Sequence, residues 1–339
     1  MVKLAGEPAV PPVRWGILST ARIARQRVAP AMLKSESTVI AAVASRSLDN
    51  ARNFAGAFDI PKAYGSYQEL FDDPEIDVIY NALPNNLHLE TTLAALARGK
   101  HVLCEKPLGM SRAEAETLKA AAGPLLVAEA FMIRHHPQWH EVRRLLRAGR
   151  IGPVHTVQTF FSFLNIDPNN IRNKPETGGG AILDIGCYAI ASARFIFEAE
   201  PVRVMALIDR DPVMGTDRSV SILADFGEGR QFSASLSTQA FRHQRVGIIG
   251  TEGRIEMPTP FSAPTDETTT IGIDIHGPGQ PLDTLTIPAV DQYALQVEAF
   301  SRAVRGTGPW QYGIDDALAN MAVLDALFRS EKSGTWERP

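Results

Sequence analysis

The sequence predicts an α/β protein with a Rossmann-like, doubly wound domain over residues 13–129 and an α+β domain with a large, mostly antiparallel, open-faced sheet over residues 130–339. The chain has 339 residues, more than one hydrophobic core usually supports. In the first part, short apolar runs alternate with amphipathic stretches, which is typical of a parallel sheet covered on both faces. The long strands that follow, with few helices between them, favour an antiparallel sheet.

The composition narrows the class of partner. With 45% hydrophobic and 21% charged residues and a net charge of −4, the chain offers no basic patch to nucleic acid or an anionic membrane. It has no apolar stretch of membrane-span length and no secretory signal, so we expect a cytoplasmic protein. Cys104 and Cys187 have apolar surroundings and no metal-ligand spacing, which indicates reduced thiols and no metal site. We expect a small-molecule partner.

The first domain should contain five strands with helices between them. The expected strands are RWGIL, TVIAAVAS, DVIYNAL, HVLCEKP and PLLVAEAF, and the expected helices cover residues 21–34, 48–58, 87–98 and 112–122. Ligands of a doubly wound fold lie outside the carboxyl ends of its strands. The loops at those ends are therefore the informative ones.

The first of these loops reads GILSTARIA over residues 16–24. A dinucleotide fold needs small residues here, so that backbone N–H groups can approach a pyrophosphate. Ser19 and Ala21 stand where the first two glycines of G-x-G-x-x-G/A would be, and Ala24 takes the third place. The alternative is a plain strand-to-helix turn. The predicted cofactor contacts in this loop are Ser19, Thr20, Ala21, Arg22 and Ile23.

The second strand ends in Ser45 and Arg46, without an acid to accept from a ribose 2′-hydroxyl. A hydroxyl and a guanidinium suit a 2′-phosphate instead, so we predict NADP(H) rather than NAD(H). Asp49 lies close enough to keep NAD(H) open, and a surface arginine is the alternative reading of Arg46.

The third loop, NALPNNLH over residues 81–88, breaks its strand with proline and polar residues before a helix. Asn85 or Asn86 could cap that helix, and His88 would lie in its first turn, either on the cofactor or in solvent. The predicted cofactor contacts here are Leu83, Pro84, Asn85 and His88.

The fourth strand reads HVLCEKPL and ends in Glu105, Lys106 and Pro107. This carries a lysine past a buried strand into the same crevice, and we predict that Glu105 and Lys106 contact the cofactor. Partial burial and a nearby positive ring would lower the pKa of Lys106, so that it could move a proton near neutral pH. A solvated lysine at an ordinary strand end is the alternative.

The second domain should contain seven long strands and a buried helix. The expected strands are HTVQTFFSFL, VRVMALID, SVSILADF, QFSASLSTQA, RVGIIGT, RIEMP and DTLTIP, with further helices at residues 137–148, 291–305 and 314–330. The buried helix, residues 181–197, is apolar almost all round. Asp184 and Tyr188 share one of its faces, because they are four residues apart. A carboxylate there is costly unless it is paired or functional, so this is either a structural pair or a site.

Together, these loops and the GGGAILDIGCYAI helix resemble the family of glucose-fructose oxidoreductase, inositol dehydrogenase and MocA, from about Val13 to the final helix. Tyr188, in place of a histidine, is similar to the glucose-fructose oxidoreductase, xylose dehydrogenase and dimeric dihydrodiol dehydrogenase branch. The resemblance implies Lys106 beside the nicotinamide and the sugar, and Asp184 as a substrate-positioning residue. It also implies a homodimer or homotetramer through the second sheet, whose exposed face we expect to carry Phe160, Ser162 and Leu164.

The expected activity is NADP(H)-dependent hydride transfer to or from a sugar, or a related polyol or carbonyl compound. In this hypothesis Tyr188 exchanges the proton, Lys106 polarises the substrate oxygen and lowers the pKa of Tyr188, and Asp184 orients a neighbouring hydroxyl. Arg134 and His136 are predicted to be lesser substrate contacts. A trans-dihydrodiol or dicarbonyl substrate is an alternative, and a non-catalytic NAD(P)-binding regulator is an alternative of another class.

Overall fold

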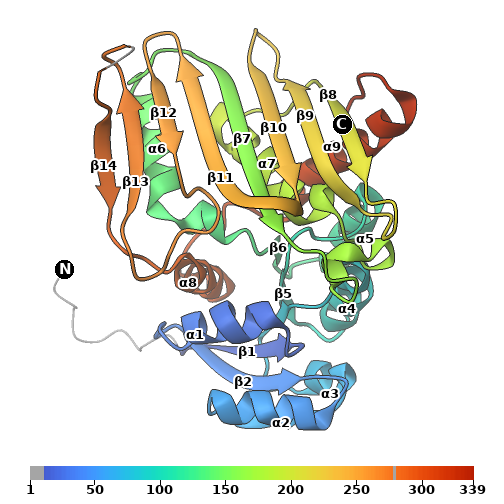
Figure 1. Cartoon of the computed structure of the whole chain (residues 1–339). Coiled ribbons are helices and arrows are strands. Elements are labelled where there is room, and N and C mark those ends of the chain that lie inside the picture. The colour runs from blue at the N-terminus through green and yellow to red at the C-terminus, as the bar shows by residue number, and fades with distance from the viewer. Residues whose placement is uncertain (1–10, 278–279) are drawn as a thin grey trace, which may run out of the picture.

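The computed structural model describes residues 11–277 and 280–339 and has two sheets, as predicted (Figure 1). The first sheet has six parallel strands in the order β3-β2-β1-β4-β5-β6. Its strands are β1 Val13–Leu18, β2 Thr38–Ala44, β3 Lys62–Tyr64, β4 Val78–Asn81, β5 His101–Cys104 and β6 Val127–Glu129. All four residues of β4 are buried, as expected for a central strand covered on both faces.

Helices flank this sheet close to the predicted positions. They are η1 Ala24–Val28 with α1 Ala29–Met32, α2 Leu48–Ala57, α3 Tyr67–Asp72, η2 Asn85–Leu87 with α4 His88–Leu96, and α5 Arg112–Ala122. Two elements, β3 and α3, were not predicted because they have only three and six residues. The start of α3 nevertheless carries a complete capping box, in which Ser66 and Glu69 satisfy each other's backbone N–H groups.

The second sheet has eight strands in the order β14-β13-β12-β11-β7-β10-β9-β8. Its strands are β7 Val154–Leu164, β8 Arg203–Arg210, β9 Asp217–Asp225, β10 Gln231–Ser237, β11 Gln239–Gly250, β12 Arg254–Met257, β13 Thr269–Asp274 and β14 Asp283–Ile287. Only β7 and β10 run parallel among the paired strands, so the sheet is mostly antiparallel, as predicted. Strand β13 was not predicted.

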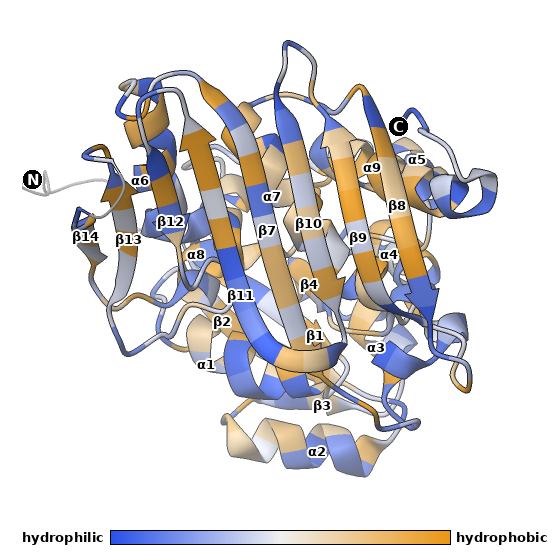
Figure 2. Cartoon of the chain, turned by 45° about the horizontal axis from the view of Figure 1, so that its top comes forward, coloured by the Kyte–Doolittle hydropathy of each residue, from blue (hydrophilic) through white to orange (hydrophobic). Residues whose placement is uncertain are grey.

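Helices cover one face of this sheet and leave the other open. They are η3 Met132–His135 with α6 Pro137–Arg147, η4 Ile171–Asn173, η5 Pro175–Thr177, η6 Ile182–Gly186 with α7 Cys187–Phe197, α8 Gln292–Val304 and α9 Ile314–Ser333. Figure 2 shows the open face in front, with α6, α7 and α9 behind it.

Every residue of α7 is buried. The segment Pro175–Phe197 is long and apolar enough to cross a membrane by composition, against our expectation that no such stretch exists, but 94% of its apolar window is buried inside the protein. Burial between the sheet and α9 explains this composition without a membrane.

Helix α8 returns from the far end of the chain to the first sheet. Val297 and Phe300 are buried against its strands, and the indole N–H of Trp15 donates a 3.0 Å hydrogen bond to Ser301 Oγ. The rings of Trp15 and Phe300 lie 5.6 Å apart. The last third of the chain therefore packs on both sheets and holds them together.

Candidate active site

Two side chains from different halves of the chain meet just after the end of β5. Lys106 Nζ lies 3.0 Å from Asp184 Oδ1 and 2.7 Å from the Asp184 carbonyl oxygen. The two side chains are only 12% and 13% exposed. Asp184 lies in η6, whose first N–H group, that of Ile182, donates to Asp217 Oδ2 at 2.6 Å. The sequence-predicted pair of a strand-end lysine and a helical aspartate is thus brought into direct contact.

A second cation, which the sequence analysis did not select, binds the other oxygen of Asp184. Arg172 Nε lies 2.8 Å from Asp184 Oδ2. Burial alone would raise the pKa of Asp184, but Lys106 and Arg172 hold it below its ordinary value. Asp184 is therefore a carboxylate between two cations. The only local signal for Arg172 was its place twelve residues before Asp184 in a polar loop.

Burial alone would lower the pKa of Lys106, as predicted, but Asp184 together with Cys187 and Glu105 raises it above its ordinary value. The predicted lowering is therefore wrong, because the ammonium has a carboxylate partner. Lys106 is a charged hydrogen-bond donor in this site, and two of its three donors are directed at Asp184.

Tyr188 completes the group, with Lys106 Nζ 4.9 Å from the centre of its ring. Aromatic rings surround the phenol: those of Phe131, Phe161 and Phe261 have centres 5.1, 6.0 and 5.8 Å away. Burial raises the pKa of Tyr188 well above its ordinary value. The expectation that Lys106 lowers this pKa is wrong, because the ammonium binds Asp184 and the apolar rings desolvate the phenolate.

The first loop fits a dinucleotide. Ser19 adopts a left-handed conformation with φ of +89°, the conformation that glycine allows in the usual fingerprint, and its N–H donates to Ala44 O at 2.9 Å. No side chain caps η1, and Ala21 and Ala24 leave room for a ligand near the start of the helix. Thr20 and Ile23 are half-buried there, and Arg22 is exposed with its Nε on Gln26.

The end of β2 places Ser45 and Arg46 where a ribose phosphate would lie in this fold. Ser45 is buried, and its hydroxyl accepts a 3.4 Å hydrogen bond from Ser47 N. Arg46 is exposed, and its charge reaches the Tyr67 phenol. The side chains fit a 2′-phosphate, because the guanidinium has no carboxylate partner in the described part of the chain.

The third loop is hydrogen-bonded to the segment that follows Lys106. His88 is fully buried, with Nδ1 2.8 Å from Pro107 O and Nε2 2.8 Å from Leu83 O, so it ties the loop to the segment after Lys106. His88 is therefore neither exposed to a ligand nor solvated, against both readings of the sequence. Asn85 Nδ2 reaches across to Gly178 O at 3.0 Å, and Pro84 is half-buried beside it.

Glu105 faces the Tyr80 phenol, which donates a hydrogen bond to its Oε1. Burial raises the pKa of this carboxyl above its ordinary value. The Tyr80 hydroxyl therefore supports the segment that carries Lys106, and Glu105 has a protein partner of its own.

Arg134 and one ring nitrogen of His136, Nδ1, have protein partners, whereas His136 Nε2 is buried without a partner among the described residues. Arg134 is 5% exposed, forms an ion pair with Asp316, and lies over the rings of Phe131 and Tyr312. His136 caps α6 by accepting from Gln138 N, and burial lowers its pKa to about 4. The guanidinium predicted to contact substrate is thus directed at the half-buried carboxylate of Asp316, whose position could not be read from the sequence.

Behind the site, Glu129 at the end of β6 accepts a 2.8 Å hydrogen bond from Leu108 N, two residues after Lys106. Its Oε2 is buried without a partner among the described residues. Burial raises the pKa of Glu129 to about 7, although Arg134 opposes this. No sequence pattern indicated this carboxyl, because Glu129 ends an ordinary apolar strand.

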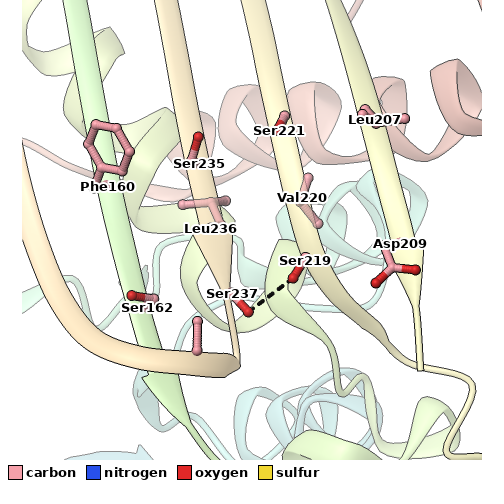
Figure 3. Close-up of a pocket in the computed structure, with 11 residues that line it drawn as sticks. Phe160, Ser162, Leu207, Asp209, Ser219, Val220, Ser221, Ser235, Leu236 and Ser237 are labelled. Atoms are coloured by element: carbon pink, nitrogen blue, oxygen red, sulfur yellow. Dashed lines mark hydrogen bonds between the residues drawn. The ribbon is translucent and has the colours of Figure 1, made fainter.

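Two surface pockets lie on the second sheet. A groove of about 340 Å³ on the open face includes Phe160, Leu207 and the hydrogen-bonded pair Ser219 and Ser237 (Figure 3). A second pocket of about 260 Å³ is lined in part by Phe161, which also packs on Tyr188. The larger pocket is thus away from the candidate chemistry, and the smaller one borders it. Within residues 11–277 and 280–339, no three His, Cys, Asp or Glu side chains are arranged to hold a metal.

Comparisons with known proteins agree with this geometry. Residues 13–125 match the model of an oxidoreductase family with an NAD-binding Rossmann fold, and residues 139–256 match the GFO/IDH/MocA C-terminal domain. The chain is 38% identical to a trans-1,2-dihydrobenzene-1,2-diol dehydrogenase of Xenopus laevis, covering 74% of this chain and 77% of that protein. It is 36% identical to an NADP⁺-dependent D-xylose 1-dehydrogenase of Haloferax volcanii, covering 94% and 98%. A 3-ketoreductase of Actinomadura kijaniata, solved with NADP and TDP-benzene, superposes with a TM-score of 0.89 at 30% identity, covering 94% and 98%.

Glu129→Gln is expected to change how stability depends on pH. The pKa of Glu129 is about 7 in the folded protein and about 4.5 in the unfolded chain. The contribution of this carboxyl to the free energy of unfolding is therefore full below pH 4.5 and is lost as the pH rises through 7. Gln cannot ionise. The free energy of unfolding of Glu129→Gln, taken relative to that of the wild type, should therefore rise by roughly 3 kcal/mol from pH 4.5 to pH 8.

Urea unfolding at several pH values in this range measures the difference. Glu90→Gln, on the exposed face of α4, is the matched control and should differ from the wild type equally at all of them. A difference for Glu129→Gln that does not change with pH contradicts the prediction.

Proposed function

The chain belongs to the Gfo/Idh/MocA family of NAD(P)-binding oxidoreductases, and we propose that it transfers a hydride between NADP(H) and a sugar or a related polyol or carbonyl substrate. The observation that carries the proposal is the meeting of Lys106, Asp184 and Tyr188 where β5 ends. The relatives include an NADP⁺-dependent D-xylose 1-dehydrogenase and a 3-ketoreductase solved with NADP and TDP-benzene. Their names support a sugar-like substrate and NADP.

The protonation states suggest how the residues divide the chemistry. The bound nicotinamide supplies or takes the hydride. Tyr188 keeps its proton at neutral pH because burial raises its pKa, so it is suited to donate that proton to the oxygen of a carbonyl being reduced. Lys106 has one donor not directed at Asp184, and it stabilises negative charge on the same oxygen. Asp184 orients a neighbouring hydroxyl.

Two other readings are weaker. A non-catalytic regulator needs a binding crevice but has no need for a buried ion pair beside a tyrosine ring, and both are present. A trans-dihydrodiol or dicarbonyl substrate remains the alternative within the enzyme class, supported by the dihydrodiol dehydrogenase relative and by the apolar rings around Tyr188.

We propose further that residues 13–129 bind the dinucleotide and residues 130–339 bind substrate and form the oligomer. The proposed cofactor contacts are Ser19, Thr20, Ala21, Arg22, Ile23, Ser45, Arg46, Leu83, Pro84, Asn85, Glu105 and Lys106, with His88 beneath them. The free thiols of Cys104 and Cys187 support the proposal of a cytoplasmic location.

The open face of the second sheet is the proposed interface between copies of the chain. Leu207 and Leu223 are 76% and 51% exposed on it, and Phe160 borders its groove. A flat face of this kind can pair with itself about a two-fold axis, which would remove its apolar side chains from water.

Tyr188→Phe and Lys106→Met should each lower turnover by about 10²–10⁴-fold, because each removes a group that handles the substrate oxygen. In Tyr188→Phe, NADPH affinity, measured by fluorescence titration, should change less than threefold. Steady-state rates with an aldose and with a ketone substrate give the measurement. An effect on turnover below threefold in both variants removes the mechanism.

Arg46→Ala should weaken NADP⁺ binding about 10- to 100-fold and leave NAD⁺ binding nearly unchanged, because a charge-assisted contact to the 2′-phosphate is lost. Dissociation constants for the two cofactors give the ratio. Arg52→Ala, exposed on α2, is the matched control and should not alter it. An unchanged ratio in Arg46→Ala means that another residue selects the cofactor.

Leu207→Glu should shift the protein from dimer or tetramer towards monomer, because a charge within the proposed interface would be desolvated. Light scattering coupled to gel filtration measures the mass. Leu33→Glu, at a 59% exposed position after α1, should leave the mass unchanged. A monomeric wild type contradicts the proposed interface.

A further inference from the structure

Arg172 is a charged residue of the site that no sequence pattern predicted. Hydrogen bonds within its loop hold its backbone in place. Its backbone N–H donates to Asn170 Oδ1 at 3.1 Å, and its carbonyl accepts from Gly180 N at 2.9 Å. A Cβ at Gly179 would lie 2.5 Å from the Arg172 carbonyl oxygen, so only glycine fits there. The backbone at Arg172 is therefore fixed by contacts on both sides.

The same loop is anchored to the first sheet. Asn85 Nδ2 donates to Gly178 O at 3.0 Å, which joins the loop to the proposed cofactor segment. The Arg172 side chain then reaches Asp184 and is 45% exposed, so its outer end faces the open part of the site. Its charge acts on Lys106 and Glu105 as well. Arg172 thus lies at the entrance, beside the reacting groups.

The hydrogen-bond inventory of the group shows what remains for a ligand. Asp184 has about four lone-pair positions. Its side-chain oxygens receive one hydrogen bond from Lys106 and one from Arg172, so acceptor positions remain on both. Neither Nη atom of Arg172 has a hydrogen-bond partner among residues 11–277 and 280–339. An acceptor and a fork of donors therefore stand side by side.

A hydroxyl is the substrate group that matches such a pair, since it donates one hydrogen bond and accepts others. A carbonyl or a carboxylate only accepts, so neither would use the free acceptor positions of Asp184. Lys106 donates to the same Asp184 and, in the proposed mechanism, to the reacting oxygen. The hydroxyl that Asp184 and Arg172 bind must therefore lie on the carbon next to the reacting one. This is the geometry of a vicinal diol or of the α-hydroxy carbonyl compound that it yields.

We propose that Arg172 and Asp184 together read a non-reacting hydroxyl next to the reacting carbon, so that the substrate class is vicinal diols and α-hydroxy carbonyl compounds. The proposal rests on the oxidoreductase function above and names the substrate class of that same site. Arg172 is its specificity-determining residue, and it also holds Asp184 in place for Lys106.

The test uses pairs of substrates that differ only in that hydroxyl: D-glucose with 2-deoxy-D-glucose, and trans-cyclohexane-1,2-diol with cyclohexanol. The full chain is assayed with NADP⁺. For the wild type, kcat/KM of the diol should exceed that of its deoxy partner at least tenfold in any pair that is turned over, because the analogue leaves Asp184 and Arg172 without a partner.

Arg172→Ala should lose about 10- to 100-fold in kcat/KM with the diol, chiefly through KM, and less than threefold with the deoxy partner. The preference between the pair should therefore collapse, which a merely structural defect would not cause. Arg172→Lys restores the charge without the fork and should recover only part of the preference. Arg147→Ala removes a surface arginine paired with Glu198 and should behave as the wild type.

Thermal-shift titration with the same pairs adds a readout that needs no turnover: the diol should stabilise the wild type at lower concentration than its deoxy partner, and Arg172→Ala should remove that difference. Equal kcat/KM for both members of the turned-over pairs, or an equal loss for both in Arg172→Ala, overturns the inference and leaves the oxidoreductase function intact. Turnover of no member of any pair, in either direction, counts against the proposed function, and the inference falls with it.

Discussion

The rest of the structure depends on the ion pair between Lys106 and Asp184. Both side chains are almost removed from water, and one belongs to the end of a strand in the first sheet while the other belongs to a helix under the second. A buried carboxylate is costly unless it is paired and hydrogen-bonded, and separating the partners would leave two uncompensated charges. The two halves of the chain are therefore locked at the point where the candidate chemistry takes place, and the ring of Tyr188 is held over the ammonium as a result.

The helix that supplies Asp184 departs from ideal geometry at that residue. Ile182–Gly186 forms a π-helical turn before the regular α7 begins, and a second π-helical turn, Ala24–Val28, follows the proposed dinucleotide loop. Such turns are rare and occur often at functional sites. At Asp184, the turn coincides with a carboxylate that must face two cations. The neighbouring Gly180 has φ of +115°, and a Cβ there would lie 1.9 Å from Asp217 Oδ1, so the entry to this turn also demands a special residue.

The sequence predicted those parts of the site that follow from local patterns. A lysine at the end of an apolar run, and an aspartate four residues before a tyrosine on a buried helix, can be recognised without knowing which elements pack together. The partners of Arg134 and His88 could not be recognised in this way. Asp316 is 182 residues from Arg134, and both ring nitrogens of His88 face backbone carbonyls, which have no sequence signature. The pKa of Tyr188 was misjudged because the sequence does not show that Asp184 engages the ammonium, or that three phenylalanine rings surround the phenol.

A buried polar network continues behind the reacting groups. Glu129 accepts a hydrogen bond from the N–H of Leu108, two residues after Lys106. Asn320 donates a hydrogen bond to the carbonyl of Cys187, the residue before Tyr188. Between them, Asp316 on α9 pairs with Arg134 and with Arg194 of α7. Proximity contributes to catalysis only if the reacting groups are held near their productive positions. An apolar core of the same volume could fill this space, but it would not fix two separate backbone segments by directional bonds. The polar network therefore explains how a lysine after β5 and a tyrosine of α7 keep a constant geometry.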